Sequence, residues 1–472
     1  GSGNDCTRCC KGRPGFDVSS DGGSTWQAVP FANISIKNSA IALAVAAQKQ
    51  PQLVRYGWDN FVECTITNSD GLPASPFQFE FVQQAQREHT HHNHKQEEQE
   101  AAVLRPPMGF NSWNSFHCNV DENLIVSMAA KMKSLGLASA GYQYVNIDDC
   151  WQAARDNTSG RIIEDQARFP SGMANLTARI HDMGLKFGLY TAQAQYTCQK
   201  RPGSYSFEEV DAHTYCEWGI DYIKIDGCNG QKWPRQNTSW IKFREVLSKC
   251  GVVMSVESCG DPDTCGQWIT DVADLWRTDG DIQTTFESVL HNIHANDKMA
   301  KVARPGHYND PDMLQCGNAG LSFEEQKTHF SLWALSAAPL LISTDIRYIG
   351  DETLQILKNK EVIEVDQDLG FNGAVQGTQV ATQANDTEVW VKRLSNGSSG
   401  EARFAVVLVN LAGDSSRDVT VTWEQVGLED SKTASVRDLW AEKTLGKFSH
   451  EFTAKGVAPH GSVMLRLECN ER

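Results

Sequence analysis

The sequence contains no run of basic residues and no long hydrophobic segment. Its 472 residues include 43 Lys and Arg against 59 Asp and Glu, which gives a net charge of -16 at pH 7. Because nucleic-acid phosphates are bound by clustered basic side chains, this balance argues against a nucleic-acid partner. The longest apolar run, residues 40–47, is far shorter than the roughly 20 residues of a membrane helix. We therefore expect a protein that binds neither nucleic acid nor a membrane.

The sequence also lacks paired C-x-x-C units followed by histidine ligands, the usual pattern of a zinc site. Its 14 cysteines therefore indicate disulfides, and we expect no metal and no other cofactor. Six N-x-S/T sequons are compatible with a glycoprotein. They begin at Asn33, Asn157, Asn175, Asn237, Asn385 and Asn396. Because disulfides are rare in the cytosol, these features favour a secreted protein or one in a lysosome-like compartment.

A polar, charge-dense segment at residues 83–103 has no apolar periodicity and divides the chain. We interpret it as a solvated linker after a β-rich N-terminal segment, residues 1–82. The linker contains four histidines, without cysteine or carboxylate at a fixed ligand spacing. We therefore favour a solvated linker over a metal site. The histidines are His89, His91, His92 and His94.

Residues 104–378 alternate short β-rich runs with amphipathic stretches. Eight such runs lie near Phe110, Val145, Leu189, Ile223, Ser255, Arg277, Pro305 and Ile342. This length and rhythm predict an α/β fold, a (β/α)8 TIM barrel. A doubly wound sheet is the alternative, but no Gly-rich phosphate turn follows a strand. Residues 379–472 show a period near two and Gly and Asn turns, which predict a C-terminal antiparallel β-sandwich.

Polar side chains recur where the barrel strands are predicted to end. They are Trp113, Asp148, Asp149, Tyr190, Lys224, Asp226, Glu257, Arg277, Asp281, Asp310 and Asp312. A single Asp at a strand end is more often a helix cap or a turn former. In a TIM barrel, however, the carboxyl ends of all strands meet on the face where chemistry occurs. Carboxylates combined with aromatic side chains suit a sugar, and two carboxylates are the minimal machinery of glycoside hydrolysis.

The run YIKID, residues 222–226, illustrates the arrangement. Side chains alternate across a strand, so Tyr222, Lys224 and Asp226 should face one way and Ile223 and Ile225 the other. We expect the isoleucines to meet the surrounding helices and the charged groups to enter the mouth of the barrel. The Lys224 ammonium would then help to keep Asp226 ionised.

Residues 104–472 resemble the clan-D α-galactosidases and α-N-acetylgalactosaminidases of glycoside hydrolase family 27. The resemblance rests on eight motifs in chain order: PPMGFNSWNSFHCNV, NIDDCWQ, GLKFGLYT, WGIDYIKIDGC, LWRTDGDI, NDPDMLQCGN, LWALSAAPLLISTDI and VIEVDQD. It implies a retaining exo-glycosidase that removes terminal α-galactose by double displacement. By motif, Asp226 matches the nucleophile and Asp281 the acid/base, whereas the family's spacing from Arg277 rules out Asp279.

The same resemblance implies the groups that bind the sugar. Asp148 and Asp149 match the pair that holds the 4- and 6-hydroxyls, and Lys224 matches a ligand of the 3- and 4-hydroxyls. Glu257 and Arg277 match the groups around O2. Trp113 and Tyr190 match the aromatic walls, and Asp312 matches a carboxylate that supports the binding groups.

The resemblance also implies disulfides between Cys118 and Cys150 and between Cys198 and Cys228. Cys259 and Cys265 form a plausible local third pair. They lie in VESCGDPDTC, where Ser258 replaces an aromatic residue found in many relatives.

The loop VESCGDPDTC, which departs from the family pattern, also bears on which substrate the enzyme prefers. Glu257 favours a 2-hydroxyl over a bulkier 2-acetamido group, so we expect an α-galactosidase before an α-N-acetylgalactosaminidase. A β-L-arabinopyranosidase of the same family and a catalytically weak galactose-binding protein are the alternatives. Whether the chain forms a homodimer stays open.

Residues 15–82 resemble the C-terminal end of the sialate O-acetylesterase family. The resemblance rests on two stretches, DGGSTWQAVPFANISI and VRYGWDNFVECTITNSDGLPASPF. The serine motif of that family is absent, so we expect no esterase activity. One hypothesis is that the natural protein is a longer fusion of an esterase with a glycosidase.

Overall fold

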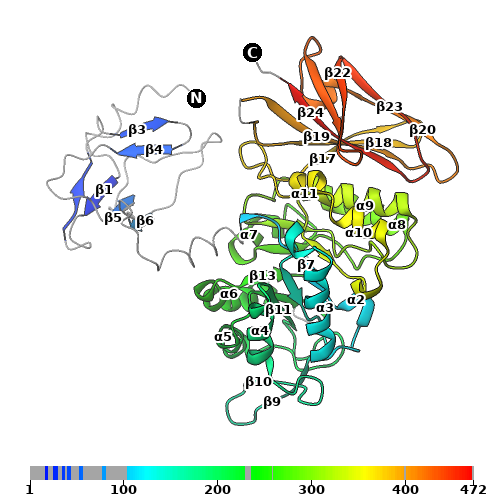
Figure 1. Cartoon of the computed structure of the whole chain (residues 1–472). Coiled ribbons are helices and arrows are strands. Elements are labelled where there is room, and N and C mark those ends of the chain that lie inside the picture. Colours follow the sequence, from blue (N-terminus) through cyan, green and yellow to red (C-terminus); the bar gives the residue numbers. More distant parts are fainter. Residues whose placement is uncertain are drawn as a thin grey trace. The chain divides into compact units, whose positions relative to one another are not determined.

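The computed structural model describes residues 16–19, 25–29, 34–37, 40–43, 53–56, 77–80, 104–228, 235–257, 259–397 and 400–469. The chain divides into two compact units, Gly1–His92 and Asn93–Arg472 (Figure 1). The predicted linker at 83–103 and its four histidines lie outside the described residues. None of the helices in the described parts has the length and apolar character of a membrane span.

The first unit is rich in β-strands, as predicted. Four strands form an antiparallel sheet in the order β2-β1-β5-β6, and two more form a hairpin. The sheet strands are β1 (Phe16–Ser19), β2 (Gln27–Ala28), β5 (Leu53–Tyr56) and β6 (Phe77–Glu80), and the hairpin strands are β3 (Ile34–Lys37) and β4 (Ala40–Leu43). Val18 and Val54 are opposite each other on β1 and β5, and both are buried.

The second unit begins with an eight-stranded parallel sheet in the order β15-β14-β13-β12-β11-β8-β7-β16. The strands are β7 (Met108–Asn111), β8 (Tyr144–Asn146), β11 (Lys186–Ala192), β12 (Tyr222–Asp226), β13 (Val253–Val256), β14 (Leu275–Arg277), β15 (Tyr308–Asp310) and β16 (Leu340–Ile342). A parallel bridge between Leu314 and Ile342 joins its two edges. The sheet therefore curls into the predicted barrel.

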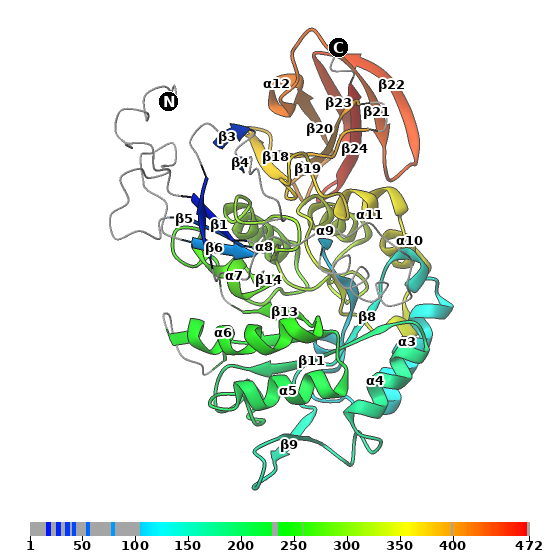
Figure 2. The same ribbon diagram turned by 90° about the vertical axis from the view of Figure 1, so that its left-hand side faces the viewer.

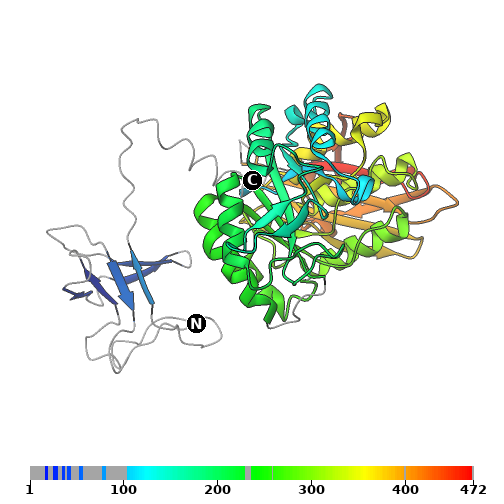
Figure 3. The same ribbon diagram turned by 90° about the horizontal axis from the view of Figure 1, so that it is seen from below.

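Helices alternate with these strands and cover their outer surface. Figure 2 shows α4, α5 and α6 side by side, and Figure 3 views the two units from below. The helices are α2 (Trp113–Phe116), α3 (Glu122–Ser134), α4 (Met173–Asp182), α5 (Glu208–Trp218), α6 (Arg235–Leu247), α7 (Ile269–Val272), α8 (Phe286–Lys298), α9 (Phe323–Leu335), α10 (Asp351–Leu357) and α11 (Lys360–Asp366). α3 begins where the Asp121 side chain accepts a hydrogen bond from the Leu124 amide, and α9 begins at a capping box of Ser322 and Glu325.

The alternation predicted for β12 is confirmed. Ile223 and Ile225 are fully buried in the large core that also contains Tyr215 of α5 and Phe243 of α6. Tyr222 belongs instead to a smaller cluster inside the barrel, with residues of five other strands. Apolar burial on the outer face thus fixes the strand and turns its polar residues inward.

The C-terminal part is the predicted antiparallel β-sandwich. A six-stranded sheet, in the order β17-β18-β19-β24-β21-β22, packs against the pair β20-β23. Its elements are β17 (Thr378–Gln383), β18 (Thr387–Arg393), β19 (Ala402–Asn410), β20 (Arg417–Thr422), α12 (Trp423–Val426), β21 (Thr433–Asp438), β22 (Lys443–Ser449), β23 (Glu451–Val457) and β24 (Ser462–Cys469). Trp423 and Val406 lie in its core.

Candidate active site

A cavity of about 550 Å³ opens at the carboxyl ends of the barrel strands. Nine of the ten predicted site residues line it, from β7, β8, β11, β12, β14, β15 and the segments that follow them. They are Trp113, Asp148, Asp149, Tyr190, Lys224, Asp226, Arg277, Asp281 and Asp312. The tenth, Glu257, is buried behind Lys224 and Arg277. The convergence predicted from the strand ends is therefore observed.

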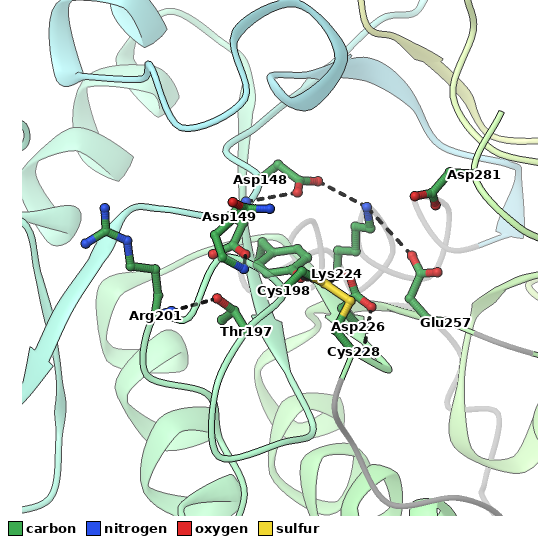
Figure 4. The surroundings of a disulfide bond; sticks show 12 residues. Asp148, Asp149, Thr197, Cys198, Arg201, Lys224, Asp226, Cys228, Glu257 and Asp281 are labelled. Atoms are coloured by element: carbon green, nitrogen blue, oxygen red, sulfur yellow. Dashed lines mark hydrogen bonds and ion pairs between the residues drawn. A yellow bond between two sulfur atoms is a disulfide. The ribbon is translucent and has the colours of Figure 1, made fainter. Parts of the chain in front are cut away.

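Lys224 connects two carboxylates. Its Nζ lies 3.1 Å from Oδ2 of Asp148 and 3.7 Å from Oε1 of Glu257 (Figure 4). Burial alone would lower the pKa of Lys224, but the two carboxylates raise it well above its ordinary value. The ammonium is therefore charged, and its ion-pair partners are Asp148 and Glu257 rather than Asp226, the residue next to it on the strand face.

Asp149 is held in place by backbone amides. The Cys150 amide donates to its Oδ1 at 2.6 Å, and the Gln199 amide donates to its Oδ2 at 2.9 Å. Burial raises the pKa of Asp149, and these hydrogen bonds oppose the rise. Gln199 belongs to the loop after β11, so this loop is attached to the Asp149 wall of the pocket.

Asp226 also receives fixed donors on both oxygens. The Tyr190 hydroxyl donates to Oδ2 at 2.7 Å, and the Cys228 amide donates to Oδ1 at 3.0 Å. Burial and the negative charge of Asp226 raise the pKa of Tyr190, so the phenol stays protonated and can donate. These two bonds fix the carboxylate in the pocket.

Disulfides anchor the loops around the site, and all three predicted pairs are confirmed. They are Cys118–Cys150, Cys198–Cys228 and Cys259–Cys265. A fourth bond, Cys216–Cys250, joins the end of α5 to the turn after α6 and was not predicted. Ser258, on which the predicted wall near O2 depended, lies outside the described residues.

Arg277 and Asp312 support the loop that carries Asp281. Arg277 Nη2 donates to the Gly280 carbonyl at 2.7 Å and lies 3.0 Å from Oδ2 of Asp312. The same Oδ2 accepts a hydrogen bond from the Ile282 amide at 2.9 Å. Within the described residues, the Asp281 side chain makes one polar contact, of 3.4 Å with Arg277, and it is 79% exposed. Its loop is thus fixed while its carboxylate is open to the pocket.

Two further buried carboxylates lie beneath this wall. Burial raises the pKa of Glu257, and the paired cations Arg277 and Lys224 oppose the rise. Burial likewise raises the pKa of Asp310 to about 6, against the attraction of Arg277. The Asp310 side chain accepts the Asp312 amide at 2.9 Å and so supports the Asp312 backbone, whose φ is +88°. Asp310 was noticed at the strand end, but this supporting contact was not predicted.

Several residues that line the pocket or support its lining were not predicted from the sequence. Asn111 donates to Oδ2 of Asp148 at 3.0 Å. Trp113 lies edge-on to His117, which also lines the pocket. Gln283 and Gln315 line the wall near Asp281. Polar residues in loops show no periodic pattern in the sequence. Whether they reach the pocket depends on how the chain folds, so the sequence alone did not identify them. Asn111 alone had a signal, because it is polar and ends a buried strand.

A barrel whose strand ends gather carboxylates, a lysine, an arginine and aromatic rings defines a carbohydrate-active hydrolase. Residues 105–368 match the protein family described as Alpha galactosidase A, and residues 384–467 match the Alpha galactosidase C-terminal beta sandwich domain. The chain therefore belongs to the α-galactosidase family of glycoside hydrolases.

Individual relatives agree with this assignment. "Alpha-galactosidase 2" of Arabidopsis thaliana is 42% identical over 372 residues, which cover 77% of this chain and 90% of the relative. The crystal structure of α-galactosidase I from Mortierella vinacea is 32% identical, with a TM-score of 0.71, and covers 78% of this chain and 98% of its own. A Bacteroides fragilis structure assigned as an α-galactosidase/melibiase is 28% identical, with a TM-score of 0.71, and covers 93% of this chain and 90% of its own. The match to that structure is therefore longer than the match to the Mortierella enzyme.

Proposed function

We propose that the protein is a retaining exo-α-galactosidase that releases terminal α-D-galactosyl residues from oligosaccharides, glycolipids or glycoproteins. The observation that carries the proposal is the presence of two unlike carboxylates in one pocket. Asp226 is fixed by two donors, and Asp281 is exposed on another wall. This is the division of roles that a double displacement requires.

In the first step, the Asp226 carboxylate attacks C1 of the galactosyl residue. Asp281 donates its proton to the glycosidic oxygen, so the leaving alcohol departs neutral and a galactosyl ester forms on Asp226. In the second step, Asp281 accepts a proton from a water molecule that attacks C1 and breaks the ester. The two inversions retain the α-configuration, and each residue returns to its starting protonation state.

The bound sugar would be oriented by charged groups on the other walls. Asp148 and Asp149 would accept hydrogen bonds from the 4- and 6-hydroxyls, and Lys224 would donate to the 3- and 4-hydroxyls. The Trp113 indole would cover an apolar face of the ring. The pairing of Asp148 with Lys224 at 3.1 Å supports this assignment, because the two groups need not move to bind neighbouring hydroxyls of the sugar.

The C2 substituent decides between galactose and N-acetylgalactosamine. Arg277 and Glu257 lie 3.5 Å apart, and we assign them to the side of the pocket that receives O2. A 2-acetamido group would need space where these two residues are packed. We therefore propose an α-galactosidase in preference to an α-N-acetylgalactosaminidase, and the acceptors for O4 and O6 disfavour a β-L-arabinopyranosidase, whose substrate lacks C6.

A panel of three nitrophenyl glycosides tests this proposal. The α-galactoside should be hydrolysed fastest, followed by the α-N-acetylgalactosaminide and the β-L-arabinopyranoside, with proton NMR following the anomer that forms first. First-formed α-galactose supports retention, whereas first-formed β-galactose would remove the nucleophilic role of Asp226. Binding of galactose without turnover of any of the three substrates would favour a galactose-binding protein.

We also propose that residues 15–82 derive from the C-terminal end of a sialate O-acetylesterase-like domain, without esterase activity of their own. A full-length transcript that encodes no hydrolase domain upstream would contradict a fusion origin. A secreted or lysosome-like location is proposed on the four disulfides of the described residues, and N-glycosylation is proposed on exposed sequon residues such as Asn157. A loss of mass on treatment with an N-glycosidase would test the glycosylation.

A further inference from the structure

The side of the pocket that holds Asp281 continues into a wall rich in amide and hydroxyl side chains. Its lining residues come from three segments, 113–117, 282–284 and 313–319. Asp281 is the proposed proton donor to the glycosidic oxygen, so the group that leaves with that oxygen must depart on this side. The wall therefore faces the part of the substrate that is not galactose.

Hydrogen bonds join the three segments of this wall. Nδ2 of Asn114 and Nδ2 of Asn318 lie 2.9 Å and 3.3 Å from Oγ of the buried Ser343. Nδ2 of Asn318 also donates to Oε1 of Gln315 at 2.7 Å, and Nε2 of Gln315 donates to the Ile282 carbonyl at 3.3 Å. These contacts run from α2 to the loop of the acid/base, so the wall is formed before a substrate binds.

Ser343 determines how the two asparagine amides are turned. Its hydroxyl donates to the Leu314 carbonyl at 2.7 Å, so its oxygen can only accept hydrogen bonds from other groups. Both asparagines must therefore present their NH2 groups to Ser343. No described residue donates to Oδ1 of Asn114, and among the described residues Oδ1 of Asn318 has one long contact, of 3.5 Å with the Ser115 hydroxyl. Two amide oxygens are thus left as acceptors in the wall.

Gln283 provides a third acceptor close to the acid/base. Its exposed side chain lines the pocket two residues after Asp281. Its amide nitrogen lies 3.3 Å from the Asp281 carbonyl, and no described residue donates to its Oε1. The loop is braced by close packing, because a Cβ on Gly320 would lie 2.2 Å from the Thr284 carbonyl oxygen. Glycine at this position lets the two loops approach each other.

Three amide oxygens in one wall suit a ligand that donates several hydrogen bonds, as the hydroxyls of a sugar do. An apolar leaving group would find little surface to bind. Of the large hydrophobic side chains that are exposed in the described residues, none lines the pocket. The two aliphatic side chains of this wall, Ile282 and Met313, are buried. The chemistry of the wall therefore favours a polar leaving group.

We propose that Asn114, Asn318 and Gln283 form a subsite for a second sugar, the one to which the terminal galactose is linked. The amide oxygens accept hydrogen bonds from hydroxyls of that sugar and hold its glycosidic oxygen near Asp281. The subsite gives the enzyme a preference for galactose linked to a sugar over galactose linked directly to an alkyl or lipid alcohol. This inference rests on the proposed function, because the role of Asp281 defines the side on which the leaving group departs.

Three galactosides with alcohol leaving groups test the subsite. They are methyl α-galactoside, octyl α-galactoside and galactosyl-α1,6-glucose. Each leaving group needs a proton from the acid, so differences in kcat/KM report mainly on contacts beyond the galactose. We expect kcat/KM for galactosyl-glucose to exceed that for methyl α-galactoside at least about fivefold, as two or three hydrogen bonds would allow. The octyl compound should stay within about threefold of the methyl compound, because the wall offers no apolar surface.

Matched variants assign the effect to the amides. Gln283→Met and Asn114→Leu each remove an amide at nearly constant size. Each should lower the ratio of kcat/KM for galactosyl-glucose to that for methyl α-galactoside by about 2- to 12-fold, the loss of one neutral hydrogen bond. Asn119→Leu, at an exposed residue that does not line the pocket, is the control and should leave the ratio unchanged. Thermal unfolding checks each fold, and the exposed Gln283 keeps the test decisive if Asn114→Leu does not fold.

The outcomes separate the subsite from the proposed function. A ratio that falls in either pocket variant but not in Asn119→Leu supports the subsite. An unchanged ratio in the folded pocket variants would overturn it, as would a wild type that hydrolyses octyl α-galactoside as fast as galactosyl-glucose. In both of those cases the proposed hydrolysis of α-galactosides stands. No hydrolysis of any of the three compounds would contradict the proposed function, and the subsite with it.

Discussion

The two walls of the pocket differ in how firmly they hold their carboxylates. On the β11–β12 side, Asp226 receives a hydroxyl and an amide hydrogen bond and lies against a disulfide. On the β14 side, the Asp281 carboxylate makes one polar contact among the described residues, of 3.4 Å with Arg277, and it is 79% exposed. The difference suits the two roles that we propose: a nucleophile must be aimed at one carbon atom, whereas an acid/base must reach a leaving group and then a water molecule.

The largest effect should follow loss of the fixed carboxylate. Asp226→Ala should lower kcat by at least about 10³-fold, because the proposed galactosyl ester could no longer form on this residue. Steady-state hydrolysis of nitrophenyl α-galactoside measures this, with thermal unfolding as a control for the fold. Activity within tenfold of the wild type would place the nucleophile elsewhere.

The exposed carboxylate should show an effect that depends on the leaving group. Asp281→Ala should cost about 10²- to 10⁴-fold with a sugar leaving group, which needs a proton. The loss in the first step should be much smaller with nitrophenol, which leaves as an anion. Comparison of pre-steady-state rates for the two substrates checks this. Equal losses would contradict the acid role, and Asp279→Ala, in the same loop, serves as the matched control.

The hydroxyl that fixes Asp226 should contribute less. Tyr190→Phe removes one hydrogen bond to a charged acceptor, worth about 1.5–3 kcal/mol, so kcat/KM should fall roughly 10- to 150-fold. Tyr196→Phe serves as a control, because Tyr196 is exposed and is not among the residues that line the pocket, and this substitution should change little. If Tyr190→Phe is as active as the wild type, fixation of the carboxylate is not needed for catalysis.

The smallest effect concerns stability away from the pocket. Nε2 of His294 on α8 is hydrogen-bonded to Oε1 of Glu388 on β18 at 2.9 Å. This hydrogen bond raises the pKa of His294 above 6.5. A raised histidine pKa means that the stabilisation is present below pH 6.5 and is lost as pH rises through the folded-state value. Because His294 is partly exposed, the contribution should stay below about 1 kcal/mol.

Denaturant unfolding between pH 5 and 8 measures this contribution. His294→Gln should flatten the decline in stability with rising pH, and His450→Gln, which removes an exposed histidine in contact with Asp430, serves as the matched substitution. A variant with an unchanged pH profile would show that the contact between the barrel and the sandwich is not proton-linked.

Much of the fold could be predicted because burial leaves a periodic trace in the sequence. The alternation in residues 222–226 identified both faces of β12, and their burial agrees with it. The seventh strand was expected near Pro305 but begins at Tyr308, because Arg304 and His307 pair in a tight turn just before it. Three sandwich strands, β17, β22 and β23, were not predicted; β17 and β22 are largely exposed edge strands with little apolar alternation.

The site was predicted as a set of residues, but its contacts were not. The pattern of strand ends predicted Lys224 beside Asp226 on one face of a strand. In the structure, the ion-pair partners of Lys224 are Asp148 and Glu257, which follow other strands. The Cys216–Cys250 bond was missed because spacing alone does not determine pairing. Such features depend on which loops meet in three dimensions, and local sequence patterns do not carry that information.

The central claim is that Asp226 forms the covalent intermediate, and trapping that intermediate tests it most directly. A fluorinated galactosyl fluoride, which forms the galactosyl ester faster than it is hydrolysed, should add one sugar per chain. Peptide mass spectrometry should then locate the label on Asp226, in the peptide that contains YIKID. A label on Asp281 or on any other carboxylate, or active enzyme that is never labelled, would contradict the account.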